Sequence, residues 1–327
     1  MPSFSRRNLL ALAAATVGVF LAGCAHRESE SVVKIPVASW PGYEYFYLAS
    51  ELRLDAGYGI RIDPVQYPDP QSIVHAYVRG DVDIAQLTTV EVIDICSRVP
   101  RRCPTIPLIV DESIGGDQIL ALKDYSSLSS LRGQPIAVTH STLGPYVLSR
   151  ALEGVGMKLS DVHLVNTPLD LMLDALRSGT VKAAALFPPY SQVVSRSGLT
   201  NPVFDSRSIP GEVFDVLAIE SDYAKRNPET IRALIDSWRA AHAEADANYG
   251  YTSHLAARRE GITQEEFQAS EKGLKYFSIA DQVKMLRPGG SLEQNLKAVK
   301  SVQVALGLVR NDSPLPLVSN QFLSELK

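Results

Sequence analysis

The side chains best able to bind a ligand or do chemistry in this sequence are carboxylates that follow short apolar stretches. They are Glu44, Glu91, Asp111, Asp117 and Asp215. Carboxylates gathered in a cleft attract an amine or another basic nitrogen, and an indole or phenol ring nearby can stack on such a cation. Lysine and arginine are scarce in the same segments, whereas an oxyanion site would normally use arginine or helix N-termini. We therefore expect a small organic ligand with a basic nitrogen.

The predicted ligand-binding set adds hydroxyl groups and rings from both halves of the chain. Thr88 and Thr89, like Ser141 and Thr142, precede predicted helices, whose first N–H groups can hold a carboxylate or another anion. Each group also has a structural alternative. The rings can pack in the core, and the acids can cap helices or occupy turns. Asp215 lies in an otherwise apolar strand and needs a partner, either a ligand cation or a neighbouring donor. The set is Ser39, Trp40, Tyr43, Glu44, Thr88, Thr89, Glu91, Asp111, Asp117, Ser141, Thr142, Tyr146, Pro189, Tyr190 and Asp215.

Motifs of nucleophilic or nucleotide-dependent enzymes do not occur in the sequence. There is no Gly-x-Ser-x-Gly elbow, no P-loop and no dinucleotide-binding glycine pattern. The six histidines are scattered without ligand-like spacing, so we expect no metal site and no cofactor. The net charge is −4 and no basic stripe is visible, which argues against nucleic acid as a partner. These observations favour a binding protein over an enzyme.

The N-terminus predicts export. Two arginines, Arg6 and Arg7, precede an apolar run that closes with Leu-Ala-Gly-Cys at Cys24. This pattern is similar to a bacterial lipoprotein signal, in which residues 1–23 are removed and Cys24 is acylated. An uncleaved membrane helix would need about 20 consecutive apolar residues, and this run is shorter. The paired arginines leave twin-arginine export open beside the general route.

The expected mature chain is therefore a lipoprotein anchored on the periplasmic or outer cell surface, with residues 24–32 as its tether. The other two cysteines, Cys96 and Cys103, are separated by Ser-Arg-Val-Pro-Arg-Arg. Such a pair can form a disulfide in an oxidising compartment, and the short proline-containing loop favours the bridge. Two separate thiols, one of them buried on a helix, are the alternative.

Apolar strand-like stretches alternate with helix-like ones along most of the chain, which predicts an α/β fold with mainly parallel sheets. Strands are expected at 32–38, 60–67, 82–87, 108–110, 118–122, 135–139, 162–166, 183–187 and 213–219. Helices are expected at 43–54, 72–79, 90–97, 127–133, 144–154, 170–177, 228–247 and over most of 263–306.

A weak internal repeat divides the pattern into two units. Residues 72–87 and 169–186 both run as a helix, a glycine and then a strand of small residues, which predicts two lobes of related architecture. In an open α/β sheet, ligands bind beyond the carboxyl ends of the strands. Two lobes that face each other at these ends would form a cleft suited to one small molecule.

Four segments of the sequence resemble the periplasmic substrate-binding proteins of ABC importers. The nearest branch contains nitrate-, aliphatic sulfonate-, taurine- and thiamine-precursor-binding proteins. Where this chain has Phe187-Pro188-Pro189-Tyr190, the branch often has Trp-Glu-Pro-Tyr. A carboxylate contact is therefore missing here, and the resemblance does not imply that the ligand is shared. The segments are Ser39-Trp40-Pro41-Gly42-Tyr43-Glu44 with Tyr47-Leu48-Ala49, Gly80-Asp81-Val82-Asp83-Ile84-Ala85, residues 128–138, and Phe187-Pro188-Pro189-Tyr190.

This resemblance implies a two-lobed periplasmic binding protein fold of type II, each lobe a mainly parallel sheet flanked by helices. Lobe one would comprise residues 33–122 and 212–327, and lobe two residues 123–211. Two hinge crossings are expected, near Lys123 and near Gly211. The ligand would close the lobes, and the monomeric closed form would deliver it to an ABC permease, with permease and ATPase as separate chains.

Three other functions stay open at this point. The protein could present its closed form to a membrane-bound signalling receptor without transport. It could bind an oxyanion such as a sulfonate or nitrate. It could also be an enzyme of thiamine-precursor synthesis, although the lipoprotein signal and the lack of a histidine cluster argue against that.

Overall fold

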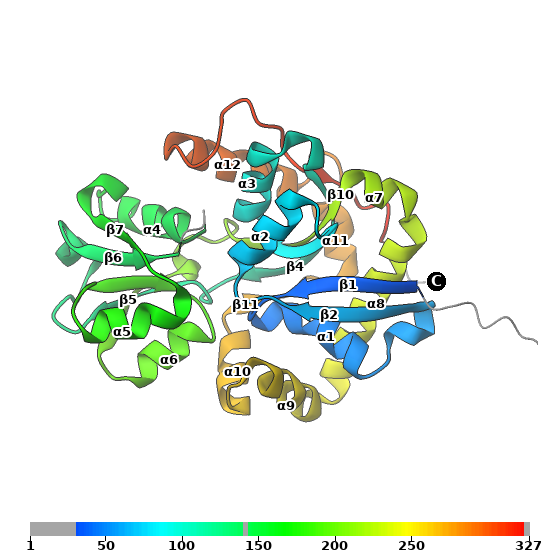
Figure 1. Ribbon diagram of the computed structural model, residues 1–327, viewed down its shortest axis with the longest axis horizontal. Coiled ribbons are helices and arrows are strands. Elements are labelled where there is room, and N and C mark those ends of the chain that lie inside the picture. Colours follow the sequence, from blue (N-terminus) through cyan, green and yellow to red (C-terminus); the bar gives the residue numbers. More distant parts are fainter. Residues whose placement is uncertain (1–30, 140–142, 324–327) are drawn as a thin grey trace, which may run out of the picture. The chain divides into compact units, whose positions relative to one another are not determined.

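The computed structural model describes residues 31–139 and 143–323 of the chain. These residues form two groups of strands, and helices pack against each group (Figure 1). The predicted export signal with Cys24, and Ser141 and Thr142 of the predicted site, lie outside the described residues. None of the helices in the described ranges is long and apolar enough to cross a membrane.

Lobe one is built on two sheets. Strands β1 and β2 pair in parallel, and a second sheet has the order β11-β4-β10-β3, with β12 also paired to β4. Every residue of β3, β4 and β10 is buried, as in a sheet that is covered on both faces. The strands are β1 (Ser31–Val37), β2 (Ile60–Gln66), β3 (Ile84–Thr88), β4 (Pro104–Ser113), β10 (Phe214–Glu220), β11 (Leu274–Lys275) and β12 (Leu317–Val318).

The α/β class and the two-lobed fold predicted from the sequence are confirmed, but the expectation of a mainly parallel sheet is wrong for lobe one. Strand β10 lies between β3 and β4 and is antiparallel to both. Strands β3 and β4 therefore point the same way without pairing with each other. The cause is the chain path, because β10 enters lobe one on its return from lobe two, at the edge where β4 leaves it.

Helices of lobe one begin and end largely where the sequence signals indicate. Helix α2 starts at Asp69, whose side chain accepts the Ser72 N–H, and ends at Gly80 with a positive φ of 87°. Helix α8 starts at Pro228 as predicted, but Asn227 makes no side-chain cap. The helices are α1 (Glu44–Glu51), α2 (Pro70–Arg79), α3 (Thr89–Arg98), α7 (Ser221–Arg226), α8 (Pro228–Ala247), α9 (Tyr249–Glu260), α10 (Gln264–Glu271), α11 (Ile279–Met285) and α12 (Ser291–Ala305).

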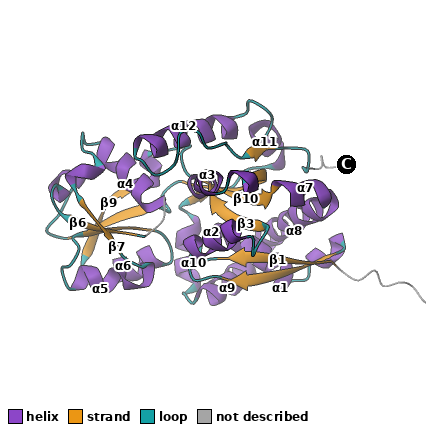
Figure 2. Ribbon diagram, turned by 45° about the horizontal axis from the view of Figure 1, so that its top comes forward, coloured by secondary structure: helices purple, strands orange, loops and turns teal. Residues whose placement is uncertain are grey.

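Lobe two holds one five-stranded sheet of order β7-β6-β8-β5-β9, in which β6 runs parallel to β7 and β8 while β5 runs antiparallel to β8 and β9. Helix α4 lies on one side of this sheet and α5 and α6 on the other (Figure 2). Alternate residues feed the two faces, since Ile119 packs in one apolar cluster and Leu120 in the other. The elements are β5 (Gln118–Leu122), β6 (Pro135–Val138), β7 (His163–Asn166), β8 (Ala183–Leu186), β9 (Thr200–Asp205), α4 (Leu143–Glu153), α5 (Met172–Arg177) and α6 (Tyr190–Arg196).

The chain crosses between the lobes twice. Because β5 pairs only with strands of lobe two, the first crossing is residues 114–117, and the crossing predicted near Lys123 is corrected to this position. The second crossing runs from the end of β9 to β10 and includes Gly211. The two crossings are joined by a hydrogen bond of 2.7 Å in which the Gly115 N–H donates to the Ser206 hydroxyl, and that hydroxyl also bonds to Ser113 at the end of β4. The expected boundary at 122/123 thus moves to the start of β5.

Candidate ligand-binding site

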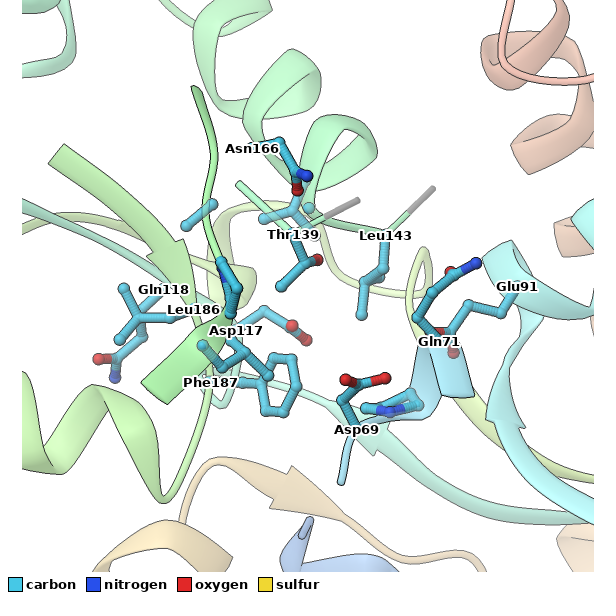
Figure 3. Close-up of a pocket in the computed structure, with 16 residues that line it drawn as sticks. Asp69, Gln71, Glu91, Asp117, Gln118, Thr139, Leu143, Asn166, Leu186 and Phe187 are labelled. Carbon is cyan, nitrogen blue, oxygen red and sulfur yellow. The ribbon is translucent and has the colours of Figure 1, made fainter. Parts of the chain in front are cut away.

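A cavity of about 180 Å³ lies between the two lobes and is called the outer chamber here (Figure 3). Helices α2 and α3 and the first crossing border it from one side, and the strand ends and helix α4 of lobe two from the other. This is the carboxyl edge at which α/β sheets bind ligands. Its lining residues are Asp69, Pro70, Gln71, Glu91, Asp117, Gln118, Thr139, Leu143, Gly144, Val147, Asn166, Pro168, Leu169, Ala185, Leu186 and Phe187.

A smaller space, the inner recess, adjoins the outer chamber and shares Glu91 and Asp117 with it. Its volume of about 10 Å³ is close to what one water-sized group, such as an ammonium, occupies. Three aromatic rings and a third carboxyl group, that of Asp215, complete it. Its lining residues are Trp40, Tyr43, Pro70, Thr88, Glu91, Asp117, Leu143, Phe187 and Asp215.

Local sequence explains how Glu91 and Thr88 reach the recess. Thr88 ends β3 and caps α3, and its hydroxyl accepts the Glu91 N–H at 3.2 Å. In return one oxygen of Glu91 accepts the Thr88 N–H at 3.0 Å, which completes a capping box. Such a box aligns the side chain with the helix start, so one carboxylate oxygen of Glu91 is used in the cap and the group is held at the cavity wall.

Tertiary structure, in contrast, brings Asp215 to the recess. On β10, Asp215 pairs with Thr88 of β3 on one side and with Asp111 of β4 on the other. The Tyr43 hydroxyl donates to Asp215 Oδ1, and Trp40 Nε1–H donates to Asp111 Oδ2 at 3.0 Å. The remaining oxygens, Asp111 Oδ1 and Asp215 Oδ2, are buried and have no hydrogen-bond partner in the described part of the chain.

Burial is the main reason why these acids hold their protons more tightly than usual. It raises the pKa of Glu91 to about 7, even though the hydrogen bonds from Thr88 favour the charged form. It raises the pKa of Asp117 to about 6 and that of Asp111 to about 7. Burial, and next the charge of Asp111, raise the pKa of Asp215 well above its ordinary range. A cation bound beside these groups would favour their charged forms.

The described residues that line the outer chamber and the inner recess include no lysine and no arginine. Besides the Tyr43 hydroxyl, the titratable groups at the walls are all carboxyl groups: those of Asp69, Glu91, Asp117 and Asp215. The same described residues contain no group of three or more histidine, cysteine or acidic side chains placed to hold a metal ion. The recess therefore presents carboxyl groups, and the outer chamber adds apolar walls beside them.

Two of the predicted site residues have structural partners elsewhere. Glu44 is fully buried and forms an ion pair with Arg259 of α9, so its carboxylate is neutralised outside the cavity. Tyr146 donates its hydroxyl to Glu212 Oε2 at 2.8 Å, and Arg150 pairs with the same carboxylate. Tyr146 thus binds α4 to the second crossing rather than facing a ligand. We correct both assignments to structural roles.

Five more of the predicted residues do not line either chamber, and one of them, Asp111, is the partner of Asp215 on the neighbouring strand. Thr89 is completely buried in the first turn of α3, and Ser39 precedes the Trp40 loop without reaching the cavity. Pro189 follows a cis peptide bond, and Tyr190 packs its ring against Phe187 with 6.2 Å between the ring centroids. Tyr190 thus supports the wall formed by Phe187.

Several residues of the outer chamber were not predicted from the sequence. Asn166 ends β7 and Phe187 directly follows β8, so the rule that ligands bind at strand ends could have identified both. Asp69 immediately precedes Pro70 and caps α2, a role that local sequence can indicate, but it lines the cavity as well. Gln71 and Gln118 carried no signal, because an amide on a helix or strand is usually a surface group.

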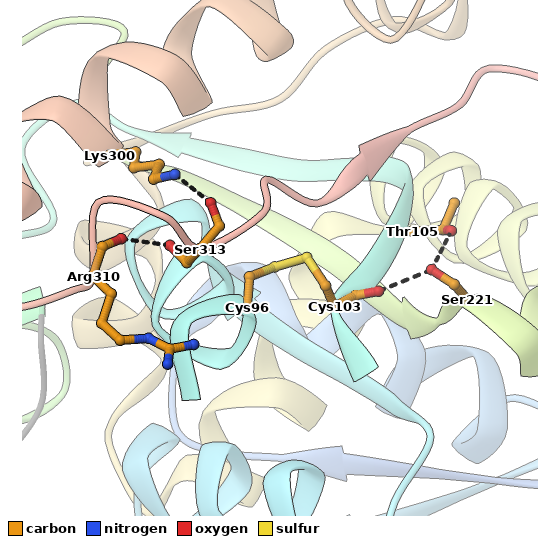
Figure 4. The surroundings of a disulfide bond; sticks show 7 residues. All are labelled: Cys96, Cys103, Thr105, Ser221, Lys300, Arg310 and Ser313. Atoms are coloured by element: carbon orange, nitrogen blue, oxygen red, sulfur yellow. Dashed lines mark hydrogen bonds between the residues drawn. A yellow bond between two sulfur atoms is a disulfide. The ribbon is translucent and has the colours of Figure 1, made fainter. Parts of the chain in front are cut away.

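A disulfide joins Cys96 at the end of α3 to Cys103 just before β4 (Figure 4). The Cys103 carbonyl accepts the Ser221 hydroxyl at 2.9 Å, which links the bridge to α7. Neither cysteine lines the outer chamber or the inner recess. The bridge therefore fixes the base of lobe one and takes no part in the cavity.

Comparison with known proteins identifies related chains. Residues 27–258 match the model of the NMT1-like family. The taurine-binding periplasmic protein of Escherichia coli K12 is 24% identical over 234 residues, which cover 68% of this chain and 72% of that protein. The structure of the periplasmic aliphatic sulphonate binding protein SsuA from E. coli aligns with a TM-score of 0.71 at 16% identity, covering 90% of this chain and all of that one (100%). The desulfurization enzyme DSZB aligns with a TM-score of 0.64 at 17% identity, over 90% and 98% of the two chains.

Proposed function

The chain belongs to the NMT1-like family and is a periplasmic solute-binding protein of the kind that serves ABC importers, and from this premise we propose that it captures a small organic amine. The ammonium group would occupy the inner recess, and the organic part would lie in the outer chamber. Closure of the lobes around the bound amine would then present it to an ABC permease.

The charge of the cavity walls carries this proposal. Asp215, Glu91 and Asp117 border the recess, and no lysine or arginine stands among the described lining residues to balance them. Asp215 Oδ2 is buried, and a proton shared with the neighbouring carboxyl group of Asp111 is what can satisfy it in the ligand-free protein, so a ligand N–H donor would take the place of that proton. An ammonium offers up to three N–H donors and a positive charge, so it satisfies both requirements in a space of this size.

An oxyanion, by contrast, would meet carboxylates at this recess. Taurine, the compound that appears in the name of one relative, carries an ammonium as well as a sulfonate. It can therefore test which of the two groups the site recognises. The rings of Trp40 and Tyr43 add a favourable surface for a cation. The apolar walls contributed by Leu143, Leu186 and Phe187 favour a ligand with a hydrocarbon part over a bare inorganic ion.

The delivery path follows the same proposal. Acylation at Cys24 would anchor the chain, and residues 24–32 would form the tether. The protein would act as a monomer, and the permease and ATPase would be separate chains. Metabolic labelling with a palmitate analogue tests the anchor, since Cys24→Ala is expected to abolish the label while the protein is still exported.

A thermal melt against matched compounds tests the ligand class. Ethylamine, ethanesulfonate and taurine share a two-carbon unit and differ only in their charged groups, and nitrate, amino acids and aminopyrimidines extend the panel. A ligand at 100 times its dissociation constant stabilises the folded protein by about 2.7 kcal/mol. We expect shifts with amines and none with ethanesulfonate or nitrate, and a weaker response in Asp215→Asn. Shifts with the oxyanions alone would overturn the proposal.

We also infer that the amine leaves the site unchanged. The similarity to the enzyme DSZB is a similarity of fold. The two described cysteines, Cys96 and Cys103, form a disulfide away from the cavity, so neither offers a free thiol to the ligand. Mass spectrometry of the bound compound after prolonged incubation tests this inference. Recovery of the intact amine is the expected result, and a product that accumulates with time would make the protein an enzyme.

A further inference from the structure

We propose that the ligand carries two basic nitrogens, one bound in the inner recess and the other at Asp69 in the outer chamber. This inference rests on the proposed function, because it concerns the same cavity and assumes that an amine enters it. It narrows the ligand class from amines in general to diamines and compounds with the same pair of charges.

The acidic side chains are spread along the cavity rather than gathered at one point. Asp215 lines only the inner recess, Glu91 and Asp117 line both spaces, and Asp69 lines only the outer chamber. In Figure 3 the carboxylates of Asp69 and Asp117 are both directed into the cavity, from α2 of lobe one and from the first crossing. A single ammonium in a recess that holds one water-sized group therefore leaves Asp69 without a counter-charge.

Asp69 retains a free oxygen for such a contact. Its Oδ1 accepts the Ser72 N–H at 2.7 Å and so caps α2. Among the described residues no other donor reaches this carboxylate, and no lysine or arginine is paired with it. Because the helix cap needs only one oxygen, Oδ2 can accept from a ligand while the cap stays intact.

The walls of the outer chamber suit the chain that would connect the two nitrogens. Leu143, Val147, Leu169 and Phe187 contribute apolar surface there, which methylene groups can contact without losing hydrogen bonds. Amide side chains such as Asn166 offer further acceptors for N–H groups. A zwitterion would place its negative end among these acids, so two positive ends fit the chamber better than one of each sign.

Titration calorimetry with matched compounds tests the inference. The purified protein is titrated at pH 8 with α,ω-diamines of three to six carbon atoms and with n-alkylamines of the same lengths. We expect the best diamine to bind at least about tenfold more tightly than its monoamine, as one added charge-assisted hydrogen bond would give. In Asp69→Asn this ratio is expected to fall to about one, whereas Asp81→Asn, at an exposed salt bridge outside the cavity, keeps it.

The outcomes separate the two proposals. If neither class of amine binds the wild-type protein, the proposed function and this inference both fail. If both classes bind with equal affinity, only the second nitrogen is refuted. If Asp69→Asn still binds the diamine more tightly than the monoamine, Asp69 does not contact the second nitrogen. The inference is then overturned. Asparagine caps helices as well as aspartate does, so Asp69→Asn is expected to fold. The ratio of the monoamine and diamine affinities of the wild-type protein tests the second nitrogen even without this variant.

Discussion

Asp111 and Asp215 face each other across the antiparallel strands β4 and β10, and each keeps one buried oxygen without a hydrogen-bond donor. The other oxygen of each is fixed, by Trp40 in the case of Asp111 and by Tyr43 in the case of Asp215. Two buried carboxyl groups in this position cannot both ionise cheaply. We infer that the pair retains a proton at neutral pH until a cation enters the recess.

Replacing Asp215 by asparagine should stabilise the ligand-free protein at pH 8. The folded pKa of Asp215 lies above its unfolded value, so ionisation as the pH rises costs stability in the wild type. Asparagine removes this cost and can donate to Asp111, so we expect a gain of about 1–3 kcal/mol in the free energy of unfolding. The gain should shrink at pH 4, where the carboxyl group is protonated in the folded state. Denaturant melts at both pH values measure it.

Asp55→Asn is a matched control for this variant. Asp55 is equally buried, but its oxygens accept the N–H groups of Ala56 at 2.9 Å and Ile62 at 2.7 Å. An amide loses one of these acceptors, so Asp55→Asn should destabilise the protein at both pH values. A destabilised Asp215→Asn at pH 8 would show that the carboxyl pair is not under electrostatic strain.

Amine affinity should rise with pH and then level off. A bound cation favours ionised carboxylates, whereas Glu91, with a pKa of about 7, and Asp117, with a pKa of about 6, are partly protonated below neutrality. Binding at pH 5.5 must therefore release protons from Glu91 and Asp117 as well as from the Asp111–Asp215 pair, whereas binding at pH 8.5 releases few from Glu91 and Asp117. Calorimetry in two buffers of different ionisation enthalpy counts the protons. An affinity that is constant from pH 5.5 to 8.5 would contradict the role of these acids.

Gly42→Ala should disturb the site through Asp111. A Cβ atom at residue 42 would lie 1.8 Å from Asp111 Oδ2, the atom that accepts the Trp40 indole N–H. The carboxylate must move, and we expect a loss of about 1–3 kcal/mol in stability together with weaker amine binding. Gly57→Ala is the control, because nothing lies within 4 Å of its Cβ position. Equal melting temperatures of the two variants would refute the close packing.

Loss of the Cys96–Cys103 bridge should lower stability without changing the cavity. The two cysteines are separated by 7 positions in the sequence, and a loop of this size restricts the unfolded chain by about 2–3 kcal/mol. Melts of Cys96→Ala/Cys103→Ala, or of the wild type with reductant, measure this loss. Amine affinity should be unchanged, because neither residue lines the cavity. A large fall in affinity would mean that the bridge positions α3 and Glu91.

Much of the fold could be predicted from local patterns. The apolar strands, the Gly80 stop and the Thr88–Glu91 capping box depend on residues within a few positions of each other. Such signals survive in any tertiary context because the groups concerned are bonded within one turn. Asn227 shows the limit of such local rules, because its side-chain amide donates to the carbonyl of Tyr223 instead of capping α8.

The sequence by itself determined most of the strands and helices, though not β9, α6, α7 or α9, together with the two lobes and the acidic character of the strand ends. Only the tertiary structure decided which acids face a ligand. Glu44 and Glu91 both occupy the first turn of a helix, yet Arg259, 215 residues further along the chain, neutralises Glu44, while Glu91 stays at the cavity wall. The role of a buried carboxylate depends on the partner that the folded chain brings to it, and that partner need not be near in sequence.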